Sequence, residues 1–185
     1  MLKQMMIVAV LGVAGCGGQP DRLAFTPAAS TLQLQPLVRS AMVRSVSLPS
    51  YAAADEISVQ AAGGLISADR SVLWADDPQR ALTLAIATTL GSITNADVGP
   101  EPWPFIGLPD VAIDIRVTQM IAAADGTFQL AGQYFVGGDG IDFRNTAHRF
   151  DIRQPMADQS LGSISAAQSA AILTLTEDIA RRIAR

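Results

Sequence analysis

The sequence has very few of the residues on which most enzymes and nucleic-acid-binding proteins depend. Among 185 residues there is one cysteine, Cys16, and one histidine, His148, and only 5% of the residues are aromatic. The only lysine is Lys3, every later basic residue is arginine, and the net charge is −4. A single cysteine excludes an intramolecular disulfide. An acidic chain without a basic stripe is a poor match for nucleic acid and for anionic lipid headgroups.

The same scarcity argues against catalysis and metal binding. Three aspartates lie near His148 in the sequence, Asp139, Asp142 and Asp151, but no Gly-x-Ser-x-Gly elbow supplies a nucleophile. The glycine-rich run at residues 137–140 has too few acids for an EF-hand loop and is typical of a hairpin turn. His148 is expected on the surface of a sheet. The sequence therefore predicts a protein that is not an enzyme and that holds no metal and no cofactor.

The N-terminus carries the pattern of a secretory signal. Lys3 precedes an apolar run from Met5 to Val13, and two small residues stand directly before Cys16. The run is about ten residues long, whereas a helix that spans a membrane needs about 20. The small residues and the cysteine resemble the bacterial lipobox, in which the thiol receives a diacylglycerol and becomes the new N-terminus after cleavage. We therefore expect residues 1–15 to be a signal peptide and Cys16 to be the lipidation site.

The residue after the cysteine bears on which membrane holds the protein. In well-studied Gram-negative bacteria an aspartate there resembles an inner-membrane retention signal, and this chain has Gly17 instead. We therefore expect a lipid anchor in the outer membrane, facing the periplasm. Residues 16–31 contain Gly-Gly, two prolines and few large apolar side chains, which predicts a flexible tether. The folded domain is expected to span residues 32–185.

Periodicity predicts the elements of this domain. Alternating apolar residues indicate strands at residues 32–35, 41–48, 57–60, 65–66 and 72–74, the last two flanking a turn at 68–70. Asp76-Asp77-Pro78 predicts the start of a helix that ends near Asn95. Three more strands are expected at residues 111–117, 128–136 and 141–152, the last one with a bulge. Ser165 and Gln168 form a capping box, which predicts a final helix.

These elements indicate a fold of the α+β class. Strands joined by short hairpins cannot be parallel, because a parallel crossover needs a dozen or more residues. The two helices are amphipathic, so each needs an apolar surface to cover. We therefore expect a two-layer domain in which a mostly antiparallel sheet carries both helices on one face.

A proline-rich segment from Gly99 to Pro109 interrupts the regular pattern. It holds four prolines together with Trp103 and Phe105. Prolines stiffen a loop, and aromatic residues are enriched at protein interfaces. Trp103 and Phe105 are therefore candidates for a partner-docking surface. The alternative is that they cap the open end of the core.

Several short stretches resemble a known family. Leu48-Pro49-Ser50-Tyr51 resembles its leucine-proline-x-tyrosine element, and the stretch at residues 72–78, which contains Trp74-Ala75-Asp76, resembles its lead into the central helix. With the lipobox, the late hairpin and the alanine-rich last helix, the chain resembles the ABC-type transport auxiliary lipoproteins, whose best-known branch is paraquat-inducible protein C. The resemblance implies an outer-membrane lipoprotein that is a non-enzymatic accessory subunit of a mammalian-cell-entry (MCE) lipid transport system and supports envelope integrity. Only Cys16 carries a family role over to this chain.

A second hypothesis belongs to a different functional class. The many glycines and alanines could leave a groove between the helices and the sheet. In that case the chain would itself be a periplasmic lipoprotein that binds a lipid or another apolar ligand. The expected partners are MCE-family transport proteins under the first hypothesis, and the sequence leaves self-association open.

Overall fold

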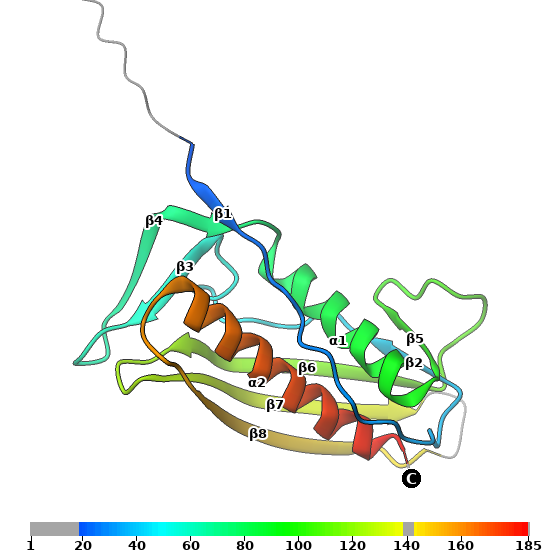
Figure 1. Cartoon of the computed structure of the whole chain (residues 1–185). Coiled ribbons are helices and arrows are strands. Elements are labelled where there is room, and N and C mark those ends of the chain that lie inside the picture. The colour runs from blue at the N-terminus through cyan, green and yellow to red at the C-terminus, as the bar shows by residue number, and fades with distance from the viewer. Residues whose placement is uncertain (1–18, 139–142, 185) are drawn as a thin grey trace, which may run out of the picture.

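The computed structural model describes residues 19–138 and 143–184 (Figure 1). Cys16, Gly17, Asp139 and Asp142 lie outside the described residues. The elements follow in the order β1 (Asp21–Leu23), β2 (Ser40–Val43), β3 (Glu56–Gln60), β4 (Ile66–Trp74), α1 (Pro78–Thr94), β5 (Asp97–Pro100), β6 (Val111–Ala122), β7 (Thr127–Gly138), β8 (Thr146–Pro155) and α2 (Leu161–Arg182).

The described strands form one eight-stranded mixed sheet. Its longest part is the antiparallel meander β6–β7–β8, and β3 and β4 form a second antiparallel hairpin. The shorter contacts are parallel: β2 lies between β6 and β5, β3 meets the end of β6, and β1 lies beside β4. The expected mostly antiparallel α+β fold is therefore confirmed. The parallel pairs were not expected, because they join segments far apart in the sequence, and hairpin patterns say nothing about such pairs.

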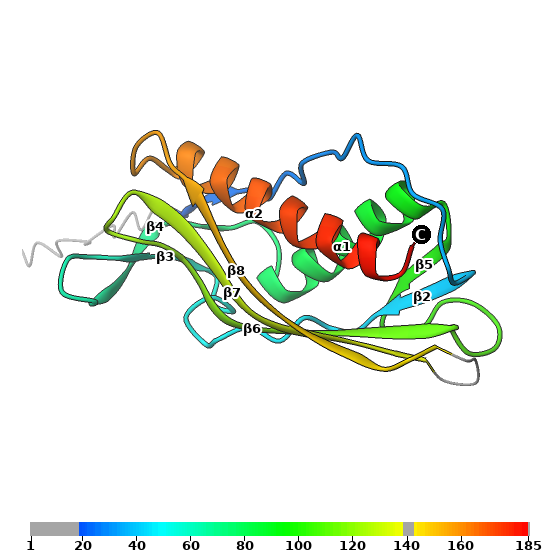
Figure 2. The same ribbon diagram turned by 90° about the horizontal axis from the view of Figure 1, so that it is seen from below.

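Both helices pack on the same face of this sheet, as Figure 2 shows. The Asp77 side chain caps α1 by accepting a hydrogen bond from the Arg80 backbone N–H at 2.7 Å, and Asn95 ends the helix in the left-handed region. This agrees with the sequence analysis. The start of α2 does not: the cap is Ser160, whose hydroxyl accepts from the Ser163 backbone N–H, so the helix begins ahead of the predicted capping box. Gln168 is buried instead of closing a cap.

Other boundaries also differ from the sequence analysis. β2 is shorter than expected, and only an isolated bridge between Ser47 and Arg116 follows it. β4 continues through the predicted turn at residues 68–70, because it pairs with β3 on both sides of a bulge, at Ile66–Asp69 and at Leu73. The predicted bulge is in β6, between Val117 and Gln119, and not in the last strand. The first two residues of the proline-rich segment, Gly99 and Pro100, belong to the end of β5, which a hairpin pattern could not reveal because its partner is the distant β2.

The core lies between the helices and the sheet, and it is filled. Its largest fully buried side chains come from α1, β6, β7 and α2, and include Ile86, Leu90, Ile113, Ile115, Tyr134, Leu175 and Ile179. Trp74 is also buried. Gly132 leaves room for the Phe150 ring beside the β6 bulge: an added Cβ would lie 2.8 Å from Phe150 Cζ and would collide with the Arg116 carbonyl oxygen. The glycine is thus required by close packing in the middle of a strand.

The chain between β1 and β2, residues 24–39, crosses the outer side of both helices, and we call it the N-terminal strap (Figure 1). The Ser169 hydroxyl donates to the Thr26 carbonyl at 2.6 Å, and the Ser30 hydroxyl donates to Glu177 at 2.7 Å. The Leu34 and Leu37 backbone N–H groups donate to the Ile93 and Ile183 carbonyls at 2.9 and 2.8 Å. These carbonyls lie at the ends of the two helices, where such groups have no partner within the helix. The strap therefore completes both helix termini.

The strap changes two expectations about the N-terminal region. The ordered structure begins ahead of Leu32, since β1 pairs with β4 and Phe25 packs against the core cluster. Residues 32–35 do not form a strand, because the Leu34 N–H bonds to a helix end and not to a neighbouring strand. Composition suggested a tether through Thr31 because this segment has few large apolar residues. Its order comes instead from hydrogen bonds to distant parts of the chain.

Candidate functional site

Residues 101–110 form a loop between β5 and β6 that is fastened at both ends; because it carries the two candidate docking residues, we call it the docking loop. At its start the Glu101 backbone N–H donates to the Val43 carbonyl at 2.8 Å, and the Glu101 carboxylate accepts from the Ser45 N–H at 3.1 Å. At its end Asp110 accepts from the Arg39 N–H at 2.7 Å and donates through its own N–H to the Ser40 hydroxyl at 3.0 Å. The loop is therefore held to β2 and its flanks at both ends.

Trp103 supports this loop from within. The side chain is half-buried, and its ring meets the Phe105 ring edge-on with centroids 4.9 Å apart. Gly99 on β5 makes the close approach possible: a Cβ there would lie 2.8 Å from the Pro104 ring and 3.3 Å from the Trp103 ring. The indole N–H is buried and finds no acceptor among the residues that the structure describes. Trp103 therefore contributes packing, and it fixes the direction in which Phe105 points.

The outer side of the docking loop is apolar. Phe105 is 49% exposed, Leu108 is 75% exposed, and Ile106 between them is fully exposed. Three large apolar side chains within four residues are unusual on a monomer surface, where single exposed apolar residues are normal. Sequence reasoning named Phe105 and missed Ile106 and Leu108. The available signal was that Phe105, Ile106 and Leu108 stand between Pro104 and Pro109 and follow neither a helical nor a strand period.

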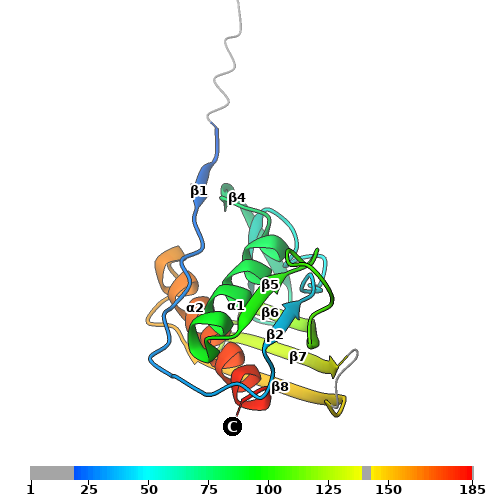
Figure 3. The ribbon, with the colours of Figure 1, turned by 90° about the vertical axis from the view of Figure 1, so that its right-hand side faces the viewer.

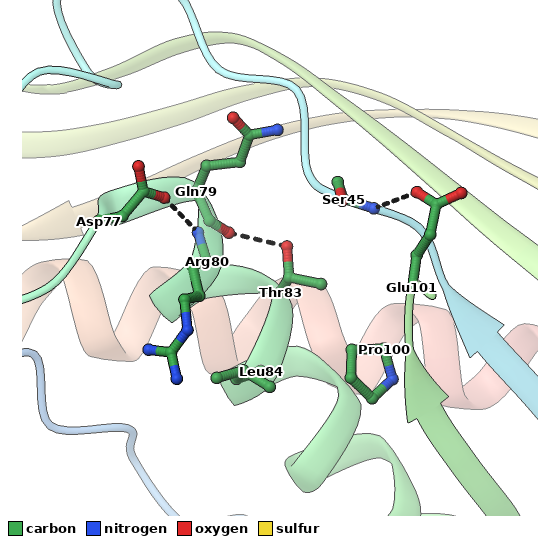
Figure 4. A pocket seen from close by; sticks show the side chains of 8 residues that line it. All are labelled: Ser45, Asp77, Gln79, Arg80, Thr83, Leu84, Pro100 and Glu101. Atoms are coloured by element: carbon green, nitrogen blue, oxygen red, sulfur yellow. Dashed lines mark hydrogen bonds between the residues drawn. The ribbon is translucent and has the colours of Figure 1, made fainter. Parts of the chain in front are cut away.

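A pocket of about 360 Å³ lies beside the start of the docking loop, between α1 and the end of β5 (Figure 4). Thr83 lies in its wall, donating to the Gln79 carbonyl at 2.7 Å and accepting from the Val46 N–H at 3.0 Å. Six of its eight lining residues are polar or charged; the residues are Ser45, Asp77, Gln79, Arg80, Thr83, Leu84, Pro100 and Glu101.

The groove that the ligand-binding hypothesis requires is not found in the described part of the molecule. The space between the helices and the sheet is occupied by the core side chains named above. A second roomy pocket, of about 350 Å³, opens on the helix-free face of the sheet beside Arg44, Asp114 and Arg116. A small apolar pocket near Phe25 and Trp74 measures about 10 Å³, and a pocket of about 260 Å³ lies between the N-terminal strap and α1, beside Phe25, Pro27 and Leu84. A lipid held between the helices and the sheet would therefore require them to separate.

His148 lies on the helix-covered side of the sheet, whereas we expected it on the open surface. It stands opposite Tyr134 on the neighbouring strand, with the two rings 5.0 Å apart. Tyr134 is fully buried and donates to Asp178 of α2 at 2.6 Å; its burial and this carboxylate raise the pKa of the phenol well above its usual value. Asp151 pairs with Arg153 on the opposite, exposed side of the strand, so His148 and Asp151 cannot form a catalytic dyad. The Tyr134–Asp178 hydrogen bond instead has a structural effect, because it joins α2 to the sheet.

The described residues show neither a metal-ligand cluster nor a membrane-spanning helix. Within residues 19–138 and 143–184, His, Cys, Asp and Glu side chains nowhere gather in a group of three that could hold an ion. In the same ranges neither helix is long and apolar enough to cross a bilayer.

Comparison with known proteins shows both the family and the fold. The family model described as ABC-type transport auxiliary lipoprotein component matches residues 22–180. Among solved structures, the crystal structure of an uncharacterized protein superposes with a TM-score of 0.72 at 18% identity, over 89% of this chain and 100% of that one. A Xanthomonas campestris protein of the DUF330 family gives a TM-score of 0.68 at 14% identity, over 85% and 92% of the two chains. A search of curated proteins finds no match.

Proposed function

The chain belongs to the family of ABC-type transport auxiliary lipoprotein components, and from this premise we propose that it is a non-enzymatic accessory subunit of an MCE-type lipid transport system. In this proposal Cys16 carries the lipid anchor after residues 1–15 are removed as a signal peptide. The lipid holds the domain at the periplasmic face of the outer membrane, and the protein supports envelope integrity by bringing transport components together there.

The observation that carries the proposal is the exposed apolar surface of the docking loop. Phe105, Ile106 and Leu108 project from a loop that is fastened at both ends, so little conformational entropy is lost when a partner covers them. Interface cores are depleted of charged residues and enriched in aromatic ones such as Phe. The partner surface should therefore be an apolar depression on an MCE-family protein.

Capture from crosslinked membranes tests the docking assignment. Ile106→Asp places a charge at the centre of the proposed interface and should weaken capture of the MCE partner by about thirtyfold, which corresponds to about 2 kcal/mol. Leu37→Asp is the control, because Leu37 is also an exposed large aliphatic residue, 50% exposed, and lies on the strap, outside the docking loop. Equal capture of the partner by the two variants would mean that the partner binds a surface other than the docking loop.

Two substitutions test the anchor independently of docking. Cys16→Ser removes the only thiol and should leave a precursor or an unanchored chain in membrane fractionation. Gly17→Asp should move the protein to the inner membrane in a sucrose gradient. An acylated Cys16→Ser chain would contradict the lipoprotein assignment, and an unmoved Gly17→Asp chain would contradict the sorting assignment.

A further inference from the structure

The turn of the β3–β4 hairpin is a second exposed apolar site, separate from the docking loop. Leu65 is 74% exposed and Ile66 is 45% exposed. They follow Gly63 and Gly64, whose φ angles of 85° and 84° form the turn. Residues 57–68 contain no charged side chain, although the protein as a whole is acidic. The hairpin thus ends in an uncharged apolar tip, which we call the hairpin tip (residues 61–66).

The start of the described chain is fixed to the same hairpin. Asp21 and Leu23 of β1 pair with Val72 and Trp74 of β4, and the Ala75 N–H donates to the Leu23 carbonyl at 2.9 Å. Cys16 lies only five residues before Asp21, and an extended chain of five residues spans at most about 18 Å. A lipid on Cys16 would therefore hold Asp21, which pairs with Val72 of β4, within about 18 Å of the bilayer surface.

The hairpin tip and β1 lie at the same end of the molecule. β1 pairs in parallel with Val72–Trp74 at the C-terminal end of β4, and the hairpin tip is the N-terminal end of β4, beyond the bulge between Asp69 and Leu73. In Figures 1 and 2 β1 and the hairpin lie toward one end of the molecule, and the docking loop lies at the other. Between the two ends runs α1, whose 17 residues span about 26 Å. Figure 3, seen from the docking-loop end, shows β5 and β2 nearest the viewer.

We propose that the hairpin tip inserts into the same membrane that holds the Cys16 lipid, so that Leu65 and Ile66 form a second contact with the lipid surface. The inference rests on the proposed lipid anchor. Apolar side chains of peripheral proteins enter the boundary between headgroups and acyl chains by about 5–10 Å. The first charged groups behind the tip, including the Glu56–Arg70 ion pair at 3.7 Å, then remain in water.

Two contacts define an orientation that one flexible lipid anchor cannot. Insertion of two side chains is weak by itself, but the anchor keeps the tip at a high local concentration beside the bilayer. With the hairpin end on the membrane, the docking loop faces away from it. The loop then points toward partners that approach from the periplasm. Because the two exposed apolar sites lie at opposite ends of the molecule, the hairpin tip contacts the membrane and the docking loop contacts the partner protein.

Site-specific labelling of the full lipidated chain tests this orientation. Because the chain has one cysteine and its thiol is blocked by the lipid, Leu65→Cys offers a single site for an NBD fluorophore. The protein is reconstituted in phosphatidylethanolamine–phosphatidylglycerol vesicles that contain nitroxide-labelled phospholipid. The Leu65 probe should shift to the blue and lose about half of its emission, as expected for a group at the acyl boundary. Ile106→Cys, labelled in the same way, should show neither effect.

The readouts separate this inference from the anchor itself. The mass of the N-terminal peptide establishes first whether Cys16 is acylated; an unacylated chain would remove both the anchor and the hairpin contact. An acylated chain whose Leu65 probe is not quenched would overturn the hairpin contact alone. Quenching that appears only after a partner protein is added, or equal quenching at Ile106, would overturn it as well. A Leu65→Ser, Ile66→Ser chain labelled at Ala62→Cys should lose most of the quenching that Ala62→Cys shows alone.

Discussion

Tyr134 on β7 donates a 2.6 Å hydrogen bond to Asp178 on α2, and this bond joins the sheet to the last helix at a fully buried ring. Asp178 also lies 3.6 Å from Arg182, one turn further along α2. The Asp178 carboxylate therefore accepts a hydrogen bond from Tyr134 of the sheet and forms an ion pair with Arg182 of its own helix. Hydrogen bonds to charged groups contribute about 1.5–3 kcal/mol, more than neutral ones. The contact thus fixes how α2 lies on the strands.

This contact predicts a loss of stability at alkaline pH. The pKa of Tyr134 is raised by burial and by Asp178, whereas in the unfolded chain it returns to about 10. The unfolded chain therefore releases a proton that the folded chain keeps, and the stabilisation present below pH 10 is lost as the pH rises above it. Urea unfolding should show a steeper decline between about pH 9 and about pH 11 for the native chain than for Tyr134→Phe. Parallel curves would mean that Tyr134 ionises freely in the folded state.

Two glycines give a matched prediction about packing. Gly132→Ala puts a Cβ against the Arg116 carbonyl and 2.8 Å from the Phe150 ring, so it should destabilise the domain by about 1–3 kcal/mol. Gly162→Ala lies in the first turn of α2, where an added Cβ meets nothing within 4 Å, and should stabilise the domain by up to about 1 kcal/mol. Thermal unfolding followed by circular dichroism compares them. Equal and small shifts would show that the β6 bulge moves to accommodate the new methyl group.

The N-terminal strap predicts where a soluble form of the chain can begin. A chain that starts at Leu32 loses β1, the Ser169–Thr26 bond and the Ser30–Glu177 bond. At about 1 kcal/mol for each hydrogen bond, it should be less stable by about 2–4 kcal/mol than a chain that starts at Gln19. This is a drop in Tm of roughly 5–15 °C. A chain that starts at Asp21 keeps these contacts and is the control. If the chain that starts at Leu32 has the same Tm as the chain that starts at Gln19, the strap contributes little to the stability of the domain.

Sequence patterns predicted local structure well and long-range pairing poorly. The cap at Asp77 and the apolar spacing behind it are local, and α1 begins and ends where they indicate. The start of α2 was misplaced because Ser160 and Ser165 both suit a cap, and only Ser160 is also held by a hydrogen bond, to Asp158 at 2.6 Å. The parallel pairing of β2 with β6 depends on which distant strand completes the sheet. No residue pattern within either strand encodes that choice.

The candidate docking site was predictable in the same uneven way. The prolines around Trp103 and Phe105 pointed to the segment that carries the exposed apolar residues. Which side chain would face outward depends on Gly99, whose missing Cβ admits Pro104 and the indole ring. That contact turns Trp103 inward and leaves Ile106 and Leu108 in solvent. Such a contact joins two elements and cannot be read from either one.

The last prediction separates support from contact within the docking loop. Phe105→Ala removes a half-exposed ring, so it should weaken capture of the partner by about tenfold or more and leave Tm unchanged. Trp103→Ala removes the ring that fixes Phe105 and fills the space beside Gly99, so it should lower both Tm and capture. Trp103→Phe keeps an aromatic ring in that place and should restore most of both. Pull-down titration and thermal unfolding of the same preparations provide the two measurements. If Trp103→Ala lowers Tm and spares capture, the loop only caps the core and the partner binds another surface.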